Sequence, residues 1–191
     1  MIPGSDKGPT FLALYDRFFE PLRDKPVRLL EMGVASGGSL RHWAKVFPKG
    51  EIVGLDLNPP EIKHSRIRTV QGNQSDPAAL DACGDTFDIV IDDCSHIGAV
   101  SRASFDHLFP KVVSGGIYAI EDWGTGYWSN WSDGAAFSPG HYAGMVGFIK
   151  DLFDRVSVND ITRGNFDGQS DQQSDIESMT LINGLVIVVK A

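Results

Sequence analysis

The stretch VRLLEMGVASGGSLRHWAKVF (27–47) joins an apolar run, a glycine-rich turn and an amphipathic segment. The apolar run predicts a buried strand, and Leu40, Trp43 and Phe47 fall on one face of the helix expected after the turn. A strand, a tight turn and a helix in this order begin a βαβ unit, which builds parallel sheets. This stretch therefore favours an α/β fold.

The same alternation continues along most of the chain. Strands are predicted at 27–33, 51–57, 66–72, 87–93 and 115–122, with helices at 39–47, 76–83 and 98–109 between them. Near-continuous apolar strands separated by amphipathic helices indicate a parallel sheet that is covered on both faces.

The C-terminal part departs from this alternation. A further helix is predicted at 141–156, and the polar stretch 164–175 is expected to be a surface loop. The runs SMTLI (178–182) and LVIVVK (185–190) are separated by Asn183-Gly184, which predicts a hairpin with positive φ at both turn residues. We therefore expect a mostly parallel sheet that ends in an antiparallel hairpin.

Size and charge limit the class of protein. At roughly 150 residues per domain, 191 residues predict a single domain over 1–191. The 25 acidic against 17 basic side chains give a net charge of −8, which argues against a nucleic-acid partner. The first residues show no signal-peptide pattern, so none is expected, and no apolar run approaches the roughly 18 residues that span a bilayer. We expect a cytoplasmic protein with a small-molecule substrate and no membrane span; a homo-oligomer is left open.

The glycine-rich turn has the composition of a nucleoside-binding loop. Glycines such as Gly33 and Gly38 let the backbone turn sharply and approach a ligand, and the following helix offers free N–H groups. The spacing from Glu31 is E-x-G-x-x-x-G-G, which fails the G-x-G-x-x-G dinucleotide fingerprint by one position. Asp56 ends the second predicted strand, where a carboxylate can accept hydrogen bonds from both hydroxyls of a ribose. The alternative is a tight turn with a helix-capping aspartate.

Two acidic pairs, Asp92-Asp93 and Glu121-Asp122, follow the fourth and fifth predicted strands. Because neighbouring parallel strands lie about 4.8 Å apart, both pairs project from the carboxyl edge of the sheet, where open α/β folds bind ligands. Carboxylates so close together repel one another unless a cation lies among them, and Mg²⁺ prefers oxygen ligands. Zn²⁺ fits less well, since one histidine and one cysteine lie nearby in the sequence. The alternative is that these acids cap loops.

His96 stands three residues after Asp93. A histidine changes its charge between pH 5 and 8 and can take a proton from a hydroxyl that a metal has acidified. Without the neighbouring acids, a lone histidine would more simply be a capping or packed residue. The position next to the acids makes His96 a candidate general base.

Several motifs together resemble one family. GVASGGSLRHW, VQGNQSD, IDDCSH, LFP, GGIYAIED and TGYW occur in this order from Gly33 to Trp128, and Ser5-Asp6-Lys7-Gly8 with Tyr15 is similar to a T-D-K-G…Y stretch of that family. The chain thereby resembles class I S-adenosylmethionine-dependent methyltransferases. Within them it is similar to the metal-dependent sugar O-methyltransferases of macrolide biosynthesis (mycinamicin and tylosin type) and their cephalosporin-hydroxylase-like and rhamnosyl O-methyltransferase relatives.

The resemblance implies a Rossmann-like, doubly wound, seven-stranded sheet whose last strand is antiparallel. It also implies the cofactor S-adenosylmethionine, held by Glu31, Gly33, Gly38, Asp56, Asn73, Gln74 and Asp92. In that comparison Gly33 lies under the methionine part, Asp56 on the ribose and Asn73-Gln74 beside the adenine, while Asp92 faces the amino-acid end. The same comparison gives Mg²⁺ to Asp93, Glu121 and Asp122, and the role of general base to His96.

The segment 123–140 is expected to cover the active site as a lid. Trp123, Tyr127, Trp128 and Trp131 are concentrated there. Aromatic faces stack on sugar rings or flat phenolic acceptors, and a closing segment excludes water from methyl transfer. The alternative is that these aromatic residues belong to the core. The chain departs from the family at Cys94, where Gly or Ala is usual, and at Gly126, where Ser is usual.

Taken together, these features favour Mg²⁺-dependent O-methyl transfer to a hydroxyl of a sugar or another vicinal diol or polyhydroxylated small molecule. An NAD-dependent oxidoreductase of similar fold would need a G-x-G-x-x-G loop and a Tyr-x-x-x-Lys pair or its equivalent, and neither is found. A non-catalytic nucleoside-binding homologue is the third candidate, and the intact set of acids with His96 argues against it.

Overall fold

In the computed structural model, the described residues are Ser5, 7–161 and 173–191. Their strands are β1 (Arg28–Met32), β2 (Glu51–Asp56), β3 (Ile67–Gln71), β4 (Phe87–Asp92), β5 (Val112–Glu121), β6 (Ile176–Ile182) and β7 (Leu185–Lys190). Their α-helices are α1 (Pro9–Phe19), α2 (Gly38–Val46), α3 (Pro77–Cys83), α4 (Gly98–Leu108), α5 (Gly144–Val156) and α6 (Val158–Ile161). Short 3₁₀ helices cover Glu20–Leu22, Phe109–Lys111 and Trp123–Tyr127.

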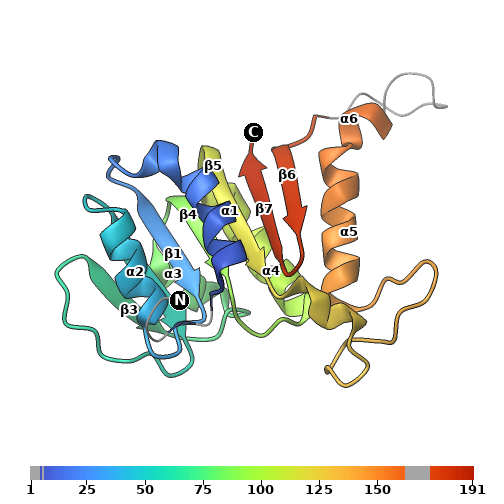
Figure 1. The fold of residues 1–191 in the computed structure, drawn as a ribbon, viewed down its shortest axis with the longest axis horizontal. Coiled ribbons are helices and arrows are strands. Elements are labelled where there is room, and N and C mark those ends of the chain that lie inside the picture. The colour runs from blue at the N-terminus through green and yellow to red at the C-terminus, as the bar shows by residue number, and fades with distance from the viewer. Residues whose placement is uncertain (1–4, 6, 162–172) are drawn as a thin grey trace.

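The strands form one seven-stranded sheet in the order β3-β2-β1-β4-β5-β7-β6 (Figure 1). β7 pairs antiparallel with both of its neighbours, and the other pairings are parallel. The predicted α/β sheet, mostly parallel with a C-terminal antiparallel hairpin, is therefore confirmed.

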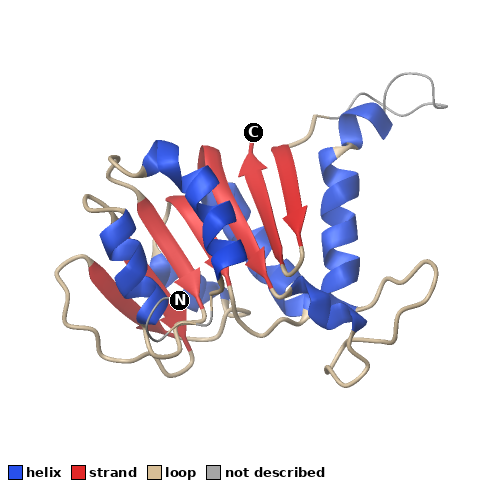
Figure 2. Ribbon diagram, in the orientation of Figure 1, coloured by secondary structure: helices blue, strands red, loops and turns tan. Residues whose placement is uncertain are grey.

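Helices cover both faces of this sheet (Figure 2). Because successive side chains of a strand point to opposite faces, Leu29 and Leu30 of β1 enter different cores. Leu29 packs in a cluster with residues of α1 and α2, whereas Leu30 packs in a cluster with residues of α3, α4 and α5. The continuous apolar runs of the central strands reflect this burial on both sides.

The strand register brings the acidic residues to one edge. Met32 of β1 pairs with Asp92 of β4, and Asp92 pairs with Ile120 of β5. The next residues along β4 and β5 are Asp93 and Glu121, so both lie at the carboxyl edge of adjacent central strands. The sheet therefore gathers the predicted acids from distant parts of the chain.

The hairpin forms where predicted, but its turn has a different conformation. Of the two turn residues only Gly184 has a positive φ, at 80°. The prediction of positive φ at both residues, Asn183 included, is therefore wrong. The Gly184 carbonyl accepts a hydrogen bond from the Asp122 backbone N–H at 2.6 Å, so the turn is fitted to the end of β5 as well as to its own strands.

Other differences concern the ends of elements. β5 begins at Val112, three residues before the predicted start, and α5 begins at Gly144 rather than at His141. The His141 ring bonds the Gly126 carbonyl at 2.7 Å, which places it with the segment that precedes the helix. Helix α1 has no counterpart among the predicted elements.

Within the described residues, no helix combines the length and the apolar character needed to cross a membrane. Asp6 and most of the predicted loop 164–175 lie outside the described residues.

Candidate active site

The turn after β1 runs directly beneath the end of β4. Gly33 has a φ of 92°, and its N–H donates to the Leu55 carbonyl at 2.8 Å. A Cβ at this position would lie 2.0 Å from the Asp93 carbonyl oxygen. Only glycine fits here, because a Cβ would clash with the backbone of Asp93, which cannot shift without a large cost in free energy. The sharp turn predicted at Gly33 is present, and the backbone that it approaches is that of Asp93.

Gly33→Ala is accordingly expected to destabilise the fold by about 3 kcal/mol or more, from the clash and the positive φ together. Thermal unfolding measures the effect. Gly8→Ala is the matched control, since a Cβ at Gly8 meets nothing within 4 Å and its φ is −76°. Equal melting temperatures for the two variants would contradict the steric argument.

Asp56 stabilises the glycine-rich turn by accepting hydrogen bonds from its backbone. Its Oδ2 accepts from the N–H groups of Val34 at 2.8 Å and Ala35 at 3.2 Å, and its Oδ1 accepts from Asn58 N–H at 2.8 Å. Burial alone would raise the pKa of Asp56, but these backbone donors outweigh it and lower the pKa. An ionised carboxylate therefore holds the turn and remains half-buried at the wall of the site.

Two cavities open at the carboxyl edge, and both include Gly33, Asp56 and Cys94 in their walls. The first, of about 300 Å³, is also lined by residues of the β3–α3 turn and of α4. The second, of about 660 Å³, is also lined by Ser5, Ala35, Asp93 and His96. The predicted ribose ligand Asp56 and the predicted metal ligand Asp93 thus line neighbouring cavities.

Asn73 and Gln74, the two residues predicted to lie beside the adenine, have different surroundings. Asn73 Oδ1 accepts from Ser75 N–H at 2.9 Å, which forms a local turn at the wall of the first cavity. Gln74 is 5% exposed, and its Nε2 donates to Asp92 Oδ1 at 3.0 Å. Its Oε1 accepts from the Cys94 thiol at 3.0 Å. Gln74 therefore links β4 to the cavity wall and uses most of its polar atoms inside the protein.

Asp92 lies behind the cavity walls, at 2% exposure. Burial raises its pKa to about 6, although the hydrogen bond from Gln74 partly opposes this. A carboxyl group whose pKa is higher in the folded than in the unfolded state makes the fold less stable as pH rises. The loss in the free energy of unfolding begins above the unfolded pKa of about 4, is complete above pH 6, and amounts to about 3 kcal/mol.

Asp92→Asn removes the ionisable group and with it this loss in the free energy of unfolding. The variant is expected to melt above the wild type at pH 7.5 and to lose that advantage at pH 4.5, where the wild-type carboxyl is largely protonated. Melting temperatures at the two pH values measure the difference. Asp85→Asn, at an exposed position, is the control. The same difference at both pH values would argue against a buried, ionisable Asp92.

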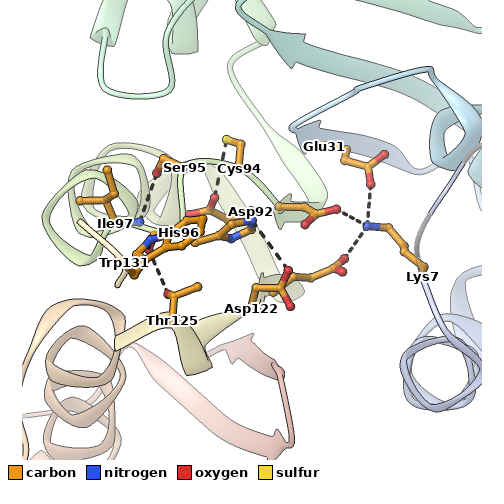
Figure 3. A network of polar contacts seen from close by, with 12 residues as sticks. Lys7, Glu31, Asp92, Cys94, Ser95, His96, Ile97, Asp122, Thr125 and Trp131 are labelled. Carbon is orange, nitrogen blue, oxygen red and sulfur yellow. Dashed lines mark hydrogen bonds and ion pairs between the residues drawn. The ribbon is translucent and has the colours of Figure 1, made fainter. Parts of the chain in front are cut away.

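Lys7 lies within an acidic cluster at this edge (Figure 3). Its Nζ is 2.6 Å from Asp93 Oδ2, 2.7 Å from Glu121 Oε1 and 3.2 Å from Glu31 Oε1. Tyr15 OH also donates to Glu121 Oε1, at 2.7 Å. Burial by itself lowers the pKa of Lys7, but the three carboxylates outweigh it and raise the pKa well above its usual value.

Glu121 is therefore surrounded by protein groups. Burial raises its pKa, and Asp93 adds to this rise while Lys7 opposes it. Glu31 is completely buried, and neither of its oxygens has a hydrogen-bond donor among the described residues. The ion pair with Lys7 is thus the main compensation for the Glu31 charge.

A second cluster consists of Asp93, His96 and Asp122. One ligand atom from each of these residues lies within 4.8 Å of the others, which suits a metal ion. His96 Nε2 and Asp122 Oδ2 are 3.8 Å apart (Figure 3). The structure therefore brings two of the three predicted metal ligands together with the predicted base, whereas the Glu121 carboxylate is turned toward Lys7 and Tyr15.

The backbone at this cluster is strained. Ser95, His96 and Asp122 have φ values of 50°, 48° and 51°, in the left-handed region that residues other than glycine seldom adopt. Strain of this kind persists where the surroundings enforce it, commonly at functional sites. At Asp122 the enforcing contact is the hydrogen bond to Gly184 described above.

His96 is held through its backbone carbonyl. Thr125 Oγ1 donates to this oxygen at 3.0 Å and Trp131 Nε1 donates to it at 2.8 Å (Figure 3). Farther along the same segment, Asp133 Oδ2 accepts from Gly98 N–H at 2.8 Å, at the start of α4. The segment that follows β5 is therefore tied to the loop that carries His96.

A third cavity, of about 510 Å³, lies at the opposite edge of the sheet and includes Arg28, Arg66 and Arg68. These guanidinium groups donate hydrogen bonds to other groups of the chain. Arg66 donates to the Phe47 carbonyl at 2.7 Å, and Arg68 donates to the Cys83 carbonyl, so each caps the end of a helix. This cavity contains none of the predicted site residues.

Curated proteins of similar sequence are named as O-methyltransferases. The mycinamicin VI 2''-O-methyltransferase of Micromonospora griseorubida is 42% identical in an alignment of 163 positions that covers 79% of this chain and 40% of the relative. The demethylmacrocin O-methyltransferase of Streptomyces fradiae is 40% identical over 79% of this chain and 41% of its own length. No protein-family model matches the chain.

Solved structures give the fold. The MycE methyltransferase of the mycinamycin pathway, in complex with Mg, SAH and mycinamycin VI, superposes with a TM-score of 0.80 at 38% identity, over 94% of this chain and 48% of that one. The chain has the class I methyltransferase fold. A putative caffeoyl-CoA O-methyltransferase from Staphylococcus aureus shares this methyltransferase fold at 16% identity and a TM-score of 0.66, over 99% of this chain and 87% of that one. Two further curated relatives are named as O-methyltransferases of a rhamnosyl tetracenomycin C, and the chain spans about 40% of the length of these curated relatives.

Within the methyltransferase fold, the predicted cofactor residues form two groups. Those at the wall of the first cavity are Gly33, Asp56, Asn73 and Gln74. Those buried away from its wall are Glu31, Gly38 and Asp92. Sequence reasoning gave no role to Lys7, Tyr15 or Thr125, although their motifs were part of the resemblance. It placed Trp131 in the lid and did not predict its hydrogen bond to the His96 carbonyl.

Proposed function

We propose that this chain is an S-adenosylmethionine-dependent O-methyltransferase that uses Mg²⁺ and methylates a hydroxyl of a sugar or a similar polyhydroxylated molecule. The observation that carries the proposal is the Asp93–His96–Asp122 cluster beside the cavities at the carboxyl edge of a methyltransferase sheet. The names of two curated relatives, which are O-methyltransferases of a rhamnosyl tetracenomycin C, support the choice of acceptor class.

The cofactor is proposed to occupy the cavities on either side of Gly33. Asn73 and Asp56 line the first cavity, which suits the adenosine part. The methionine part would lie over the glycine-rich turn and extend toward Asp93 and His96 in the second cavity. This orientation directs the methyl group at the acidic cluster. The MycE structures contain SAH and Mg, which supports the same pair of ligands here.

The acidic cluster fits a divalent cation. Asp93 and Asp122 supply the carboxylate oxygens that Mg²⁺ prefers, and His96 adds a nitrogen within the same 4.8 Å limit. Asp93 and Asp122 would hold the metal, and Glu121 would join them only if its carboxylate turned away from Lys7. A bound Mg²⁺ would supply Lewis acidity that makes an acceptor hydroxyl easier to deprotonate.

His96 is proposed to act as the general base. Its imidazole would take the proton of the acceptor hydroxyl while the oxygen forms a bond to the cofactor methyl group in line with the breaking carbon–sulfur bond. The sulfur keeps the electron pair of that bond, so the positively charged sulfonium becomes the neutral thioether of S-adenosylhomocysteine. The Asp122 carboxylate, 3.8 Å from Nε2, would stabilise the imidazolium that forms.

The segment 123–140 is proposed to form the roof over the acceptor. Trp128 and Phe137 are 51% and 73% exposed, so their rings are available to an apolar face of a ligand. The Trp131 side chain contributes a ring 6.1 Å from that of His96. Aromatic rings beside a base suit the stacking of a sugar ring during methyl transfer.

Calorimetry with S-adenosylhomocysteine, NAD⁺ and Mg²⁺, separately and in combination, tests the cofactor part of the proposal. We expect binding of S-adenosylhomocysteine and Mg²⁺ and no binding of NAD⁺. Binding of NAD⁺ without S-adenosylhomocysteine would favour an oxidoreductase and overturn the proposal. Transfer of a labelled methyl group to a panel of glycosides with vicinal hydroxyls then separates an enzyme from a non-catalytic nucleoside-binding protein.

A further inference from the structure

Lys7 is completely buried and contacts three acidic residues, each of which lies near the end of a different strand. Its side chain has no exposed surface, and its Nζ lies within 3.2 Å of oxygens of Glu31, Asp93 and Glu121. A lysine is almost never fully buried unless it is paired, so this placement requires those acids. Conversely, the acids need a cation, since carboxylates gathered around one point repel one another when all are ionised.

The position of Lys7 is fixed by the packing of α1. Gly8 caps this helix, Pro9 begins it, and the Gly8 carbonyl accepts from Leu12 N–H at 3.1 Å. Tyr15, two turns into α1, is completely buried and reaches the same Glu121 oxygen as Lys7. The docked helix α1 therefore fixes the chain beside Lys7, whose ammonium reaches the cluster.

Asp93 belongs to both clusters. Its Oδ2 contacts Lys7 Nζ at 2.6 Å, and it also contributes a ligand atom to the group with His96 and Asp122. The charge of Lys7 therefore acts directly on one of the carboxylates that would hold a divalent cation. Like charges repel, so the resident ammonium reduces the affinity of the site for a second cation.

We propose that Lys7 is a positioning residue that acts as a resident cation: it holds Glu121 and Glu31 away from the metal cluster and weakens the binding of the divalent metal to Asp93 and Asp122. This inference rests on the metal role of the proposed function. It explains why Glu121, the acid next to Asp122, is turned away from the cluster. It also gives the N-terminal segment a part in setting the affinity for the metal.

Lys7→Met tests the inference, because methionine keeps the length of the side chain and removes its charge. We expect the full chain with Lys7→Met to bind Mn²⁺, a probe for Mg²⁺, at least tenfold more tightly than the wild type in calorimetry. The metal should also raise the melting temperature of the variant more than that of the wild type, since stabilisation by a ligand grows with its affinity. A purely structural lysine would lower the melting temperature equally with and without metal.

Three further variants separate this effect from a general loss of stability. Glu31→Gln removes one of the three acids that Lys7 neutralises, so it should weaken Mn²⁺ binding about threefold or more. Opposite signs for Glu31→Gln and Lys7→Met cannot come from a common loss of stability. Lys7→Arg keeps the charge and should bind Mn²⁺ within threefold of the wild type, and Lys49→Met, at an exposed position, should leave binding unchanged.

The outcomes separate this inference from the proposed function. Mn²⁺ binding by the wild type with no increase in Lys7→Met overturns the inference and leaves the proposed metal site standing. Absence of Mn²⁺ binding in both proteins overturns the metal site and the inference together. Should Lys7→Met not fold, unchanged Mn²⁺ affinity in Glu31→Gln is sufficient to reject the resident-cation role.

Discussion

Asp93→Ala is expected to reduce metal-dependent methyl transfer by about 10³-fold or more, because stabilisation by a metal at the reacting oxygen is worth several kcal/mol. Asp93 lies in the group of possible ligand atoms and is not among the residues that line the first cavity, where the adenosine part is proposed to bind. Affinity for S-adenosylhomocysteine should therefore stay within about threefold of the wild type, while affinity for Mn²⁺ falls.

Transfer of a labelled methyl group, together with calorimetry for the two ligands, measures these changes. Asp106→Ala is the matched control, since Asp106 is exposed and lies on α4, outside the site. Loss of cofactor affinity with unchanged affinity for Mn²⁺ would assign Asp93 to the cofactor and contradict its metal role.

His96→Ala is expected to lower turnover by about 10²- to 10⁴-fold, the usual contribution of a general base. The acceptor KM and the affinity for S-adenosylhomocysteine should change far less, because the proposed role concerns proton transfer alone. His64→Ala is a suitable control, since His64 is exposed and its Nδ1 only accepts from the Arg66 N–H.

The same variant distinguishes a base from a ligand. His96 belongs to the group whose atoms could hold a metal, so Mn²⁺ affinity must be measured beside turnover. Lower turnover with unchanged Mn²⁺ affinity supports the base. A loss of Mn²⁺ affinity would make His96 a ligand instead, and full activity would remove it from the mechanism.

The sheet could be predicted because its signals are local. Apolar runs such as 51–57 and 87–93 must be strands buried on both faces, and the glycine-rich turn at 33–38 must precede a helix. The conformation of the turn between β6 and β7 was not predictable from Asn183-Gly184 alone, since its contact with Asp122 is tertiary.

The acids of the site could be located because they end strands that the sequence identifies. Their partners could not, since these depend on how distant elements dock. Nothing in the composition of α1 indicates that Lys7 reaches Asp93 and Glu121, and the similarity to a T-D-K-G stretch gave the position without its contacts. Likewise, Gln74 was expected beside a ligand, and its hydrogen bond to Asp92 follows from the packing of β4 against the turn after β3.

The hydrogen bonds from Thr125 and Trp131 to the His96 carbonyl have a consequence for redesign. A protein engineer who wished to change the acceptor would naturally exchange the segment 123–140 for that of a relative. Such a graft would also replace the two donors that restrain the left-handed backbone of His96. Chimeras that keep a hydroxyl at 125 and an indole at 131 should therefore retain turnover more often than those that do not, whatever acceptor the rest of the graft selects.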